Sequence, residues 1–597
     1  MRLEKGLSIV FAALVCAGLV NTAALAAEKA AVQARAAAGQ NVQFDVYLPL
    51  QHKAELDALL DNLHDSTSAS FHQWLTPAQF HARFGASAAT VAAVQHELEA
   101  YGLTTQVISP QQIHVSGDAS SVEQALLTQV HVGTFKNGKK TMVAVGGISL
   151  PSTMASNGAV VTGLSGFIRM RSHAKKLEAL PTNRYSEAGP YWFDDLKEAY
   201  SYPSYQVYNG KGVTIGILMS GGFNPPDMAA YFGHEKLAVP HMTTVNIAGG
   251  APYDPNDSLE THLDLQQTGG MAPAANLILY NLPDLSDANI ISGLITIIET
   301  NKADVVSMSF GGPEIGYLPA YNDGVDFTGI LGVYDDVFKQ GATQGITFVA
   351  SSGDLGALDV PAPACFDTNA TSTCGGFLES AETPASSPNV TGVGGTNLVT
   401  TMTTGSLDSK YVSEAAFGDP LAEDIFYGTP ATGAYWGSGG GNSIYYKKPT
   451  FQKLVTTGSK FRTVPDVSLQ MGGCPIGSVT PCGPDRSAAV VAIGGGLFGV
   501  VGTSISAPDF AGLTALKIQR LGTRLGNENF DIYTLAALQS TGLPLNVYRE
   551  NIQGYNGLFT TKKGYNRVLG NGTVNGVNFL LAPFAPVAGT PQTPSNP

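Results

Sequence analysis

The sequence predicts a doubly wound α/β domain with a parallel sheet, preceded by a smaller α+β unit. Four apolar runs have the composition of buried parallel strands, and they lie at 211–218, 276–280, 305–309 and 347–350. Stretches suited to helices separate them, at 258–270, 287–300 and 333–344. Strands that alternate with helices in this way are typical of a parallel sheet with helices on both faces.

The smaller unit precedes a basic linker. Period-two alternation predicts a strand over 42–48, and amphipathic patterns predict helices over 51–65 and 87–101. Further strands and one helix are expected at 104–108, 112–116 and 120–130. The segment 169–188 is polar and basic with little periodicity, so we expect an exposed linker that proteases can cut.

The N-terminus has the features of a secretory signal. Arg2 and Lys5 precede the apolar run 7–20, and small residues at 24–26 form a cleavage pattern. The run is too short to span a membrane comfortably. We therefore divide the chain into a signal peptide (1–26), the α+β unit (27–168), the linker (169–188), the α/β domain (189–584) and a Pro-rich, unstructured tail (585–597).

Composition limits the location and the partners. The signal predicts a secreted protein, periplasmic in transit, with no membrane association after the signal is removed. The 47 Asp and Glu residues outnumber the 33 Lys and Arg residues, so the basic footprint of a nucleic-acid-binding protein is missing. Four cysteines follow the signal and allow three pairings; short loops favour Cys365–Cys374 and Cys474–Cys482. A zinc site is the rival, but no His lies near them.

Ser504 is a candidate nucleophile. It lies within Gly-Thr-Ser-Ile-Ser-Ala-Pro (502–508), between an apolar, Gly-rich run and a helical stretch at 509–520. A Ser at such a junction has an exposed hydroxyl next to a helix N-terminus, which favours attack on a carbonyl. Ser and Thr also cap helices at these junctions, so the motif alone leaves both interpretations open.

The base that would activate Ser504 is not an obvious His. A Ser-His-Asp arrangement requires one, yet no His follows His262, and no His of the α/β domain lies in a His-Gly-Thr context. Either the protein is not a hydrolase or its base belongs to another residue type. His262 itself is expected to have a structural role.

Three carboxylates could supply the missing chemistry. Glu260 and Asp264 are four residues apart on a predicted helix, so they share one face. They form either a solvated acidic face or a buried pair that shares a proton and acts as a base at acid pH. Asp354 follows a strand in a Gly-flanked turn; it is either a turn former or, when protonated, a donor to an oxyanion.

Together these motifs resemble the sedolisin family of serine-carboxyl peptidases, which has a subtilisin-like fold. Glu260-xxx-Asp264, Ser-Gly-Asp354 and Gly-Thr-Ser504-xxx-Pro508 match its catalytic signatures. Further landmarks lie at 307–311, 384–388, 393–396, 436–441 and 464–468. The α+β unit resembles the family's ferredoxin-like activation domain, notably at 74–80 and 83–85. The resemblance covers almost all of the chain beyond the signal.

The resemblance implies a role for each site residue. Ser504 is the nucleophile, Glu260 the general base, Asp264 the residue that orients Glu260, and Asp354 the acid of the oxyanion hole. Substrate-binding positions are implied at Ser309, Gly311, Trp436, Gly439 and Gly440. A base and a donor of this kind require acid pH, because Glu260 must be ionised while Asp354 stays protonated.

Calcium is the one cofactor that the resemblance implies, and the sequence departs from the family there. Two Asp side chains and three backbone carbonyls are expected as ligands. The corresponding positions are Asn551, Ile552, Lys562, Gly564 and Asn566. Both Asp positions are Asn, which removes two negative charges from the ligand set. Interactions of the Asn side chains could replace the ion.

The sequence thus predicts a secreted, acid-active serine-carboxyl endopeptidase made as a self-processing zymogen. Its expected partners are protein and peptide substrates and its own prodomain, and a monomer is expected. One alternative is a catalytically inactive sedolisin-like protein that serves as a secreted binding protein. Another is a His-dependent hydrolase, which the distribution of His opposes.

Overall fold

The computed structural model describes residues 28–135, 138–179, 186–367, 374–402, 409–416, 418–420, 429–473 and 487–582. The predicted signal peptide, the C-terminal tail and the Cys474–Cys482 pair lie outside these residues.

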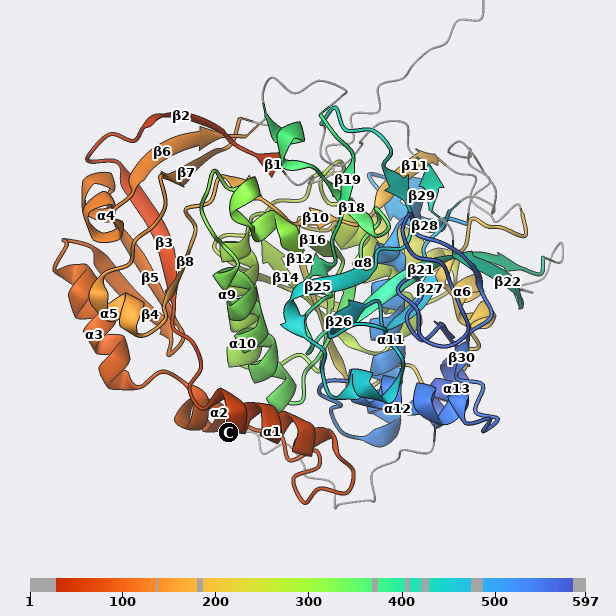
Figure 1. Ribbon diagram of the computed structural model, residues 1–597. Coiled ribbons are helices and arrows are strands. Elements are labelled where there is room, and N and C mark those ends of the chain that lie inside the picture. Colours follow the sequence, from red (N-terminus) through yellow and green to blue (C-terminus); the bar gives the residue numbers. More distant parts are fainter. Residues whose placement is uncertain are drawn as a thin grey trace, which may run out of the picture.

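An eleven-stranded sheet forms the centre of the α/β domain (Figure 1). In spatial order its main path is β13 (His241–Asn246), β14 (Asn276–Leu282), β12 (Thr214–Ser220), β15 (Val305–Met308), β17 (Thr347–Ser351), β21 (Thr391–Thr400), β27 (Val467–Gln470), β32 (Thr573–Val574) and β30 (Tyr548–Arg549). Neighbours from β13 to β32 are parallel. The predicted doubly wound sheet is confirmed.

Helices cover both faces of this sheet. Helices α9 (Asp287–Thr300) and α10 (Gly329–Thr343) lie on one face, and α8 (Leu259–Met271) and α11 (Thr503–Leu521) on the other (Figure 1). Gly293 allows α9 to approach closely, because a Cβ there would lie 2.7 Å from a methyl group of Leu218. Helix α11 begins earlier than the sequence predicts, so Ser504 lies inside its first turn.

The N-terminal unit has its own hydrophobic core. Its antiparallel sheet has the order β4 (Thr104–Ser109), β5 (Gln112–Asp118), β3 (Asn41–Tyr47) and β8 (Val160–Thr162). Helix α3 (Ala88–Glu99) lies between β3 and β4 in the chain, and α4 (Ala119–Leu126) follows β5. This is the split βαβ order of a ferredoxin-like fold. Helix α2 (Pro77–Phe84), with a capping box at Thr76, was not predicted.

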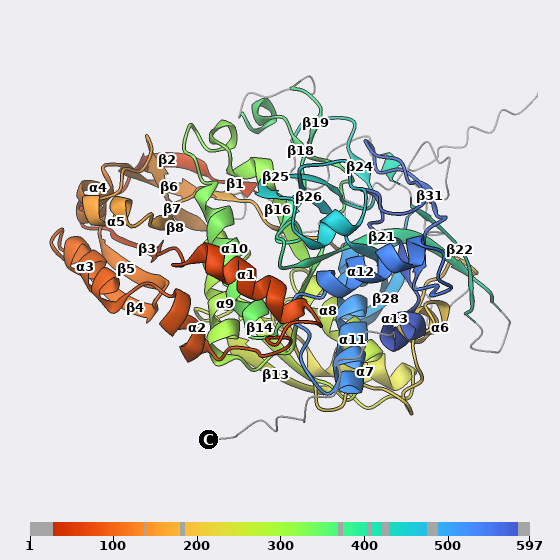
Figure 2. The same cartoon turned by 60° about the horizontal axis from the view of Figure 1, so that its bottom comes forward.

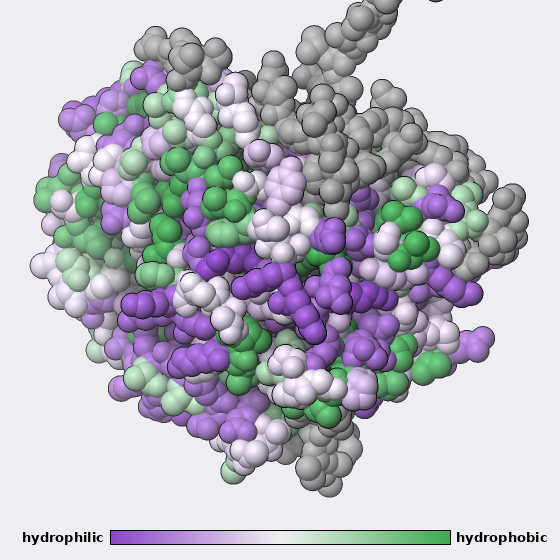
Figure 3. Space-filling view, turned by 45° about the vertical axis from the view of Figure 1, so that its right-hand side comes forward, coloured by the Kyte–Doolittle hydropathy of each residue, from purple (hydrophilic) through white to green (hydrophobic). Residues whose placement is uncertain are grey.

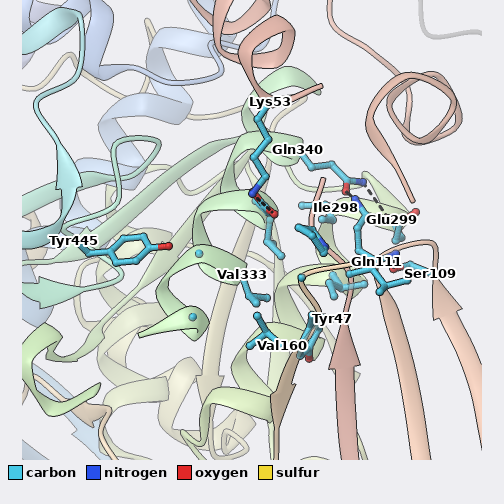
Figure 4. A pocket seen from close by; sticks show the side chains of 18 residues that line it. Tyr47, Lys53, Ser109, Gln111, Val160, Ile298, Glu299, Val333, Gln340 and Tyr445 are labelled. Carbon is cyan, nitrogen blue, oxygen red and sulfur yellow. Dashed lines mark hydrogen bonds and ion pairs between the residues drawn. The ribbon is translucent and has the colours of Figure 1, made fainter. Parts of the chain in front are cut away.

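This unit packs against α9 and α10 (Figures 1 and 2). Lys53 Nζ of α1 (Lys53–His64) lies 2.7 Å from Asp336 Oδ1, and Gln111 donates a hydrogen bond of 3.1 Å to Gln340. A cavity of about 200 Å³ lies at the same interface. Both units line it, as Figure 4 shows, and none of the four predicted catalytic residues does.

Among the described residues, no helix has both the length and the apolar character needed to cross a bilayer. On the face shown in Figure 3, hydrophilic residues occupy much of the middle, and hydrophobic residues lie in separate groups around them.

Candidate active site

Glu260 and Asp264 are buried on α8, one helical turn apart. Ser309 donates a hydrogen bond from its hydroxyl to Asp264 Oδ1, and Ser172 donates one to Glu260 Oε2. The other two carboxyl oxygens, Glu260 Oε1 and Asp264 Oδ2, are buried without a hydrogen-bond partner among the described residues. The pair is therefore not a solvated acidic face.

Burial makes this pair retain protons. It raises the pKa of Glu260 well above its ordinary value, and the neighbouring Asp264 charge raises it further. Burial likewise raises the pKa of Asp264 well above its ordinary value. Two such carboxyls titrate as a unit, so one proton is held between them while the pair carries a single negative charge. A carboxylate of this kind can accept a proton from a nearby hydroxyl.

Ser504 lies next to this pair. It follows β29 (Gly496–Val501) and Gly502, whose φ of 141° suits glycine. Gly502 is the N-cap of α11, so Ser504 is not the residue that caps the helix. The Ser504 hydroxyl donates a hydrogen bond of 3.4 Å to the carbonyl of Ser309, the residue whose hydroxyl bonds Asp264. The Ser172 and Ser504 side chains lower the pKa of Glu260, opposing the larger effect of burial.

Asp354 contacts Thr503, the residue before Ser504. Its Oδ1 accepts hydrogen bonds from the Thr503 backbone N–H (2.7 Å) and hydroxyl (2.8 Å). Its Oδ2 is buried without a hydrogen-bond partner among the described residues. Burial raises the pKa of Asp354 to about 7. Since Oδ1 is occupied as an acceptor, Oδ2 is the oxygen placed to carry the proton and donate it in a hydrogen bond.

The segment expected to be an exposed linker runs through this site, so the expectation of exposure is wrong for its first part. Strand β10 (Arg171–Ser172) pairs antiparallel with β16 (Phe310–Pro313), and β11 (Lys175–Ala179) pairs antiparallel with β29. The polar composition suggested solvent, but Arg169, Arg171 and His173 are all buried. Strand pairing accounts for the backbone of this segment instead, and buried carboxylates pair with Arg169 and Arg171.

The His173 carbonyl is the one presented to the catalytic groups. The His173 N–H donates to Ser309 O at 3.2 Å, which continues the β10–β16 pairing. A Cβ built on Gly502 would lie 1.8 Å from His173 O and 2.7 Å from Asp354 Oδ2. Both oxygens therefore meet at Gly502, two residues before Ser504.

Two acidic residues that the sequence did not indicate hold the linker's side chains. Arg171 contacts Asp359 through Nη2, and the same nitrogen lies 2.6 Å from Glu382 Oε1. His173 Nε2 lies 2.6 Å from Glu382 Oε2, and its Nδ1 lies 2.6 Å from Ser351 Oγ. The signal in the sequence was the basic character of the linker, which requires acidic partners once it is buried.

The predicted substrate-binding residues divide into two groups. Ser309 and Gly311 pair with the linker backbone, as described for β16. Gly439 donates a backbone hydrogen bond of 2.7 Å to Gly353 O, and Trp436 is buried in β24 (Tyr435–Trp436). A Cβ on Gly440 would lie 2.2 Å from Arg567 O. Gly439 thus supports the turn that carries Asp354, and a direct role in substrate binding stays a prediction.

His262 has structural contacts. It is buried, its Nδ1 lies 2.9 Å from Ala492 O, and its Nε2 accepts a hydrogen bond of 3.2 Å from the Asn224 N–H. Of the two predicted disulfides, Cys365–Cys374 is present.

The residues at the predicted calcium site do not fit a calcium ion. Asn566 Nδ2 donates hydrogen bonds to Lys562 O (3.1 Å) and Gly564 O (3.3 Å), two of the carbonyls expected as ligands. Its Oδ1 accepts from the N–H groups of Val568 and Leu569. Asn551 is exposed at the neighbouring position, before the buried Ile552. An amide therefore already satisfies carbonyls that the cation would need. No group of three or more potential metal ligands of the His, Cys, Asp or Glu type occurs in the described part of the chain.

Comparisons with known proteins find matches to both units of the chain. A family described as "Pro-kumamolisin, activation domain" matches residues 28–167, and the "Subtilase family" matches residues 242–555. The chain is 27% identical to sedolisin from Pseudomonas sp. (strain 101) over 566 residues, covering 92% of this chain and 87% of the relative. It is 25% identical to kumamolisin from Bacillus sp. (strain MN-32) over 570 residues, covering 91% of this chain and 92% of that relative. Among solved structures, Pseudomonas sedolisin, a serine-carboxyl proteinase, superimposes with a TM-score of 0.53 at 25% identity, covering 67% of this chain and 98% of that one.

Proposed function

Because the chain belongs to the subtilase family and joins a serine-type peptidase domain to a pro-kumamolisin activation domain, we propose that it is an acid-active, self-processing endopeptidase. The observation that supports this most is that Ser309 links Ser504 to the buried Glu260–Asp264 pair. Its carbonyl accepts a hydrogen bond of 3.4 Å from the Ser504 hydroxyl, and its own hydroxyl donates one to Asp264. The proposal assigns Ser504 as nucleophile, Glu260 as base, and Asp264 as the residue that orients and shares the proton of Glu260. The predicted signal peptide supports secretion.

The proposed reaction has two proton-balanced stages. Ser504 Oγ attacks the carbonyl carbon, and its proton passes to Glu260. Protonated Asp354 donates a hydrogen bond to the oxyanion that forms. The C–N bond then breaks, and the proton on Glu260 moves to the departing amine. Water attacks the acyl-serine ester in the same manner, giving a proton to Glu260 that returns to Ser504 as the ester C–O bond breaks.

The first substrate in this proposal is the chain itself. The His173 carbonyl lies against Gly502 beside Asp354, and strands pair with the linker on both sides of it. We therefore place the first cut at the His173–Ala174 bond. Until it is cut, the linker stays paired with β16 and β29 beside Ser504, and the N-terminal unit acts as a self-inhibiting prodomain.

An inactive binding protein is the alternative function. It would need the proposed catalytic groups to be absent, whereas Ser504, Glu260, Asp264 and Asp354 are all present and buried. No separate observation favours that alternative.

Acidification of the purified precursor tests the proposal. In a pH series from about 7, the pKa of Asp354, down to about 4, the ordinary carboxylate pKa, we expect self-cleavage that yields a new N-terminus at Ala174 and a product that hydrolyses casein. Ser504→Ala and Glu260→Gln precursors should remain intact. The proposal is wrong if purified Ser504→Ala processes itself in isolation, or if the acidified wild-type protein hydrolyses no protein substrate.

A further inference from the structure

We propose that Glu382 and Asp359 form a specificity site, which favours polypeptides with a cationic side chain three residues before the bond that is cut. This inference rests on the proposed function, because it uses the linker as a bound substrate. It adds two residues and a substrate class to the catalytic groups described above.

The register of the linker defines the positions. Arg171 is opposite Gly311 and Ser172 opposite Phe310 in the antiparallel pairing of β10 with β16. His173 continues the pairing and presents its carbonyl at Gly502. His173 is thus the first residue before the scissile bond and Arg171 the third. A substrate that pairs with β16 in the same register must place its own third residue where Arg171 lies.

The side chains of the first and third residues reach the same acidic residue. In an extended strand, residues two apart project to the same side. Accordingly, Glu382 Oε1 lies 2.6 Å from Arg171 Nη2, and Glu382 Oε2 lies 2.6 Å from His173 Nε2. Asp359 contacts the same guanidinium nitrogen. All four side chains are buried, so the Arg171 ion pairs are shielded from solvent. Burial lowers the pKa of His173 to about 4, so its contact with Glu382 becomes an ion pair only at acid pH.

Glu382 and Asp359 belong to the peptidase domain, so they remain when the linker leaves. Glu382 lies in β20 (Glu382–Thr383), which pairs with β16, and Asp359 lies in β18 (Leu358–Pro361). Burial raises the pKa of both carboxyls, and the charge of Arg171 opposes that effect, so a cation at this place favours their ionised form. A buried carboxylate that loses its cation is destabilised, and a cationic substrate restores the interaction.

The space around the Glu382 carboxyl supports the same assignment. Cβ atoms built on Gly311 and Gly353 would lie 2.3 Å from Glu382 Oε2 and 2.5 Å from Glu382 Oε1, respectively. These two glycines leave room for the Glu382 carboxyl to reach the linker side chains. A larger residue at either position would displace it.

Matched peptides test the inference with the wild-type enzyme alone. The probes are internally quenched peptides with the sequence of residues 169–176, carrying Arg, or its uncharged isostere citrulline, at the position of Arg171. With acid-activated enzyme, we expect cleavage between His and Ala and a kcat/KM about 10- to 100-fold higher for Arg, the range for a charge-assisted hydrogen bond. Equal kcat/KM values, or cleavage at another bond, would overturn the inference.

Variants test whether Glu382 and Asp359 cause the preference for Arg. Glu382→Gln and Asp359→Asn should reduce the preference for Arg over citrulline to within about threefold, as the ratio of the two kcat/KM values measured with the same variant. Glu379→Gln, at an exposed neighbouring site, should keep the preference. If a precursor fails to process, it is activated by the wild-type enzyme in trans. A preference that survives both charge-removing variants overturns the inference.

Failure of the inference differs from failure of the proposed function. An acidified protein that hydrolyses casein and both peptides without distinguishing Arg from citrulline would retain the proposed function and refute the specificity site. A protein that hydrolyses neither casein nor peptides would refute both.

Discussion

The Ser172 hydroxyl donates a hydrogen bond to Glu260 Oε2, so a linker residue occupies the carboxylate that is expected to take the proton of Ser504. This hydrogen bond favours the ionised form of Glu260 and therefore lowers its pKa against the effect of burial. In the proposed function the linker therefore alters the proton affinity of Glu260 as well as occupying the place of a substrate.

Ser172→Ala should make self-processing require a higher pH. Without this hydrogen bond the pKa of Glu260 rises further, so the base becomes protonated at a higher pH. We expect the acid limb of the processing rate to move up by about 0.5 to 1 pH unit, measured by gel densitometry across a pH series. Ser149→Ala, at an exposed serine, serves as the control and should not shift the limb. An acid limb that stays in place or moves down would contradict the role given to Ser172.

Asp354 should set the alkaline limit of processing. Its pKa of about 7 means that it loses the proton required for donation as the pH rises through neutrality. Asp354→Asn keeps an acceptor for Thr503 and a donor N–H that does not titrate. We expect this variant to process more slowly than wild type at acid pH but to lack the decline near pH 7.

Asp354→Ala is the matched comparison, because it removes the donor at every pH. Loss of one oxyanion donor typically lowers the rate about 10²- to 10³-fold. The assignment fails if Asp354→Asn retains the wild-type alkaline limb, or if Asp354→Ala processes as fast as Asp354→Asn.

The sequence was informative where local spacing determines geometry. Glu260 and Asp264 were identifiable because a four-residue separation on a helix fixes their common face. The parallel strands were identifiable because they are continuous apolar runs. Glu382 and Asp359 were not, since they lie in separate short strands, β20 and β18, and only the tertiary fold brings them to the linker.

Burial of the linker was unpredictable for a related reason. Arg171 has the composition of an exposed segment, and its burial depends on carboxylates more than a hundred residues later in the chain. The capping alternative for Ser504 could likewise be decided only by the structure, because the start of α11 at Thr503 places the N-cap at Gly502.

His64 should help acid to separate the prodomain from the peptidase domain. Its Nε2 accepts a hydrogen bond of 2.8 Å from the Asn527 N–H, and its Nδ1 lies 2.7 Å from Leu60 O, so Nδ1 carries the proton. Burial lowers the pKa of His64, although the charges of Asp531 and Asp61 oppose that effect. A second proton would place an N–H against the Asn527 N–H and break the contact.

The sign of this effect follows from the lowered pKa. Neutral His64 stabilises the contact above its ordinary pKa of about 6.5, and that stabilisation is lost as the pH falls toward the lower pKa of the folded state. In a Ser504→Ala background, His64→Gln keeps an acceptor that does not titrate. We expect hydrogen exchange in α1 to increase at a pH about 0.5 to 1 unit lower than with His64 present.

His96→Gln is the control for a histidine that lies exposed on the same unit. It should leave the pH at which α1 opens unchanged. If His64→Gln opens at the same pH as the parent protein, acid release of the prodomain depends on other groups, such as His72, whose pKa burial lowers to about 4.

Calcium should have no effect on the stability of the wild-type protein, and Asn566→Asp should create a requirement for it. The Asn566 amide donates to Lys562 O and Gly564 O, which are positions where a cation would otherwise be bound. Replacing the amide by a carboxylate sets a negative charge against two carbonyl oxygens. We expect the variant to lose about 1 to 3 kcal/mol of unfolding free energy in chelator, the usual penalty for unsatisfied buried polar groups.

Added calcium should restore much of that loss in Asn566→Asp, because the carboxylate and the two freed carbonyls then offer three oxygen ligands. Thermal unfolding of both proteins with chelator and with millimolar calcium measures the effect. Asn551→Asp provides the comparison at the exposed position, where no comparable destabilisation is expected. A wild-type midpoint that falls in chelator would show that the protein binds calcium despite the Asn566 contacts, and would refute the replacement of the ion by an amide.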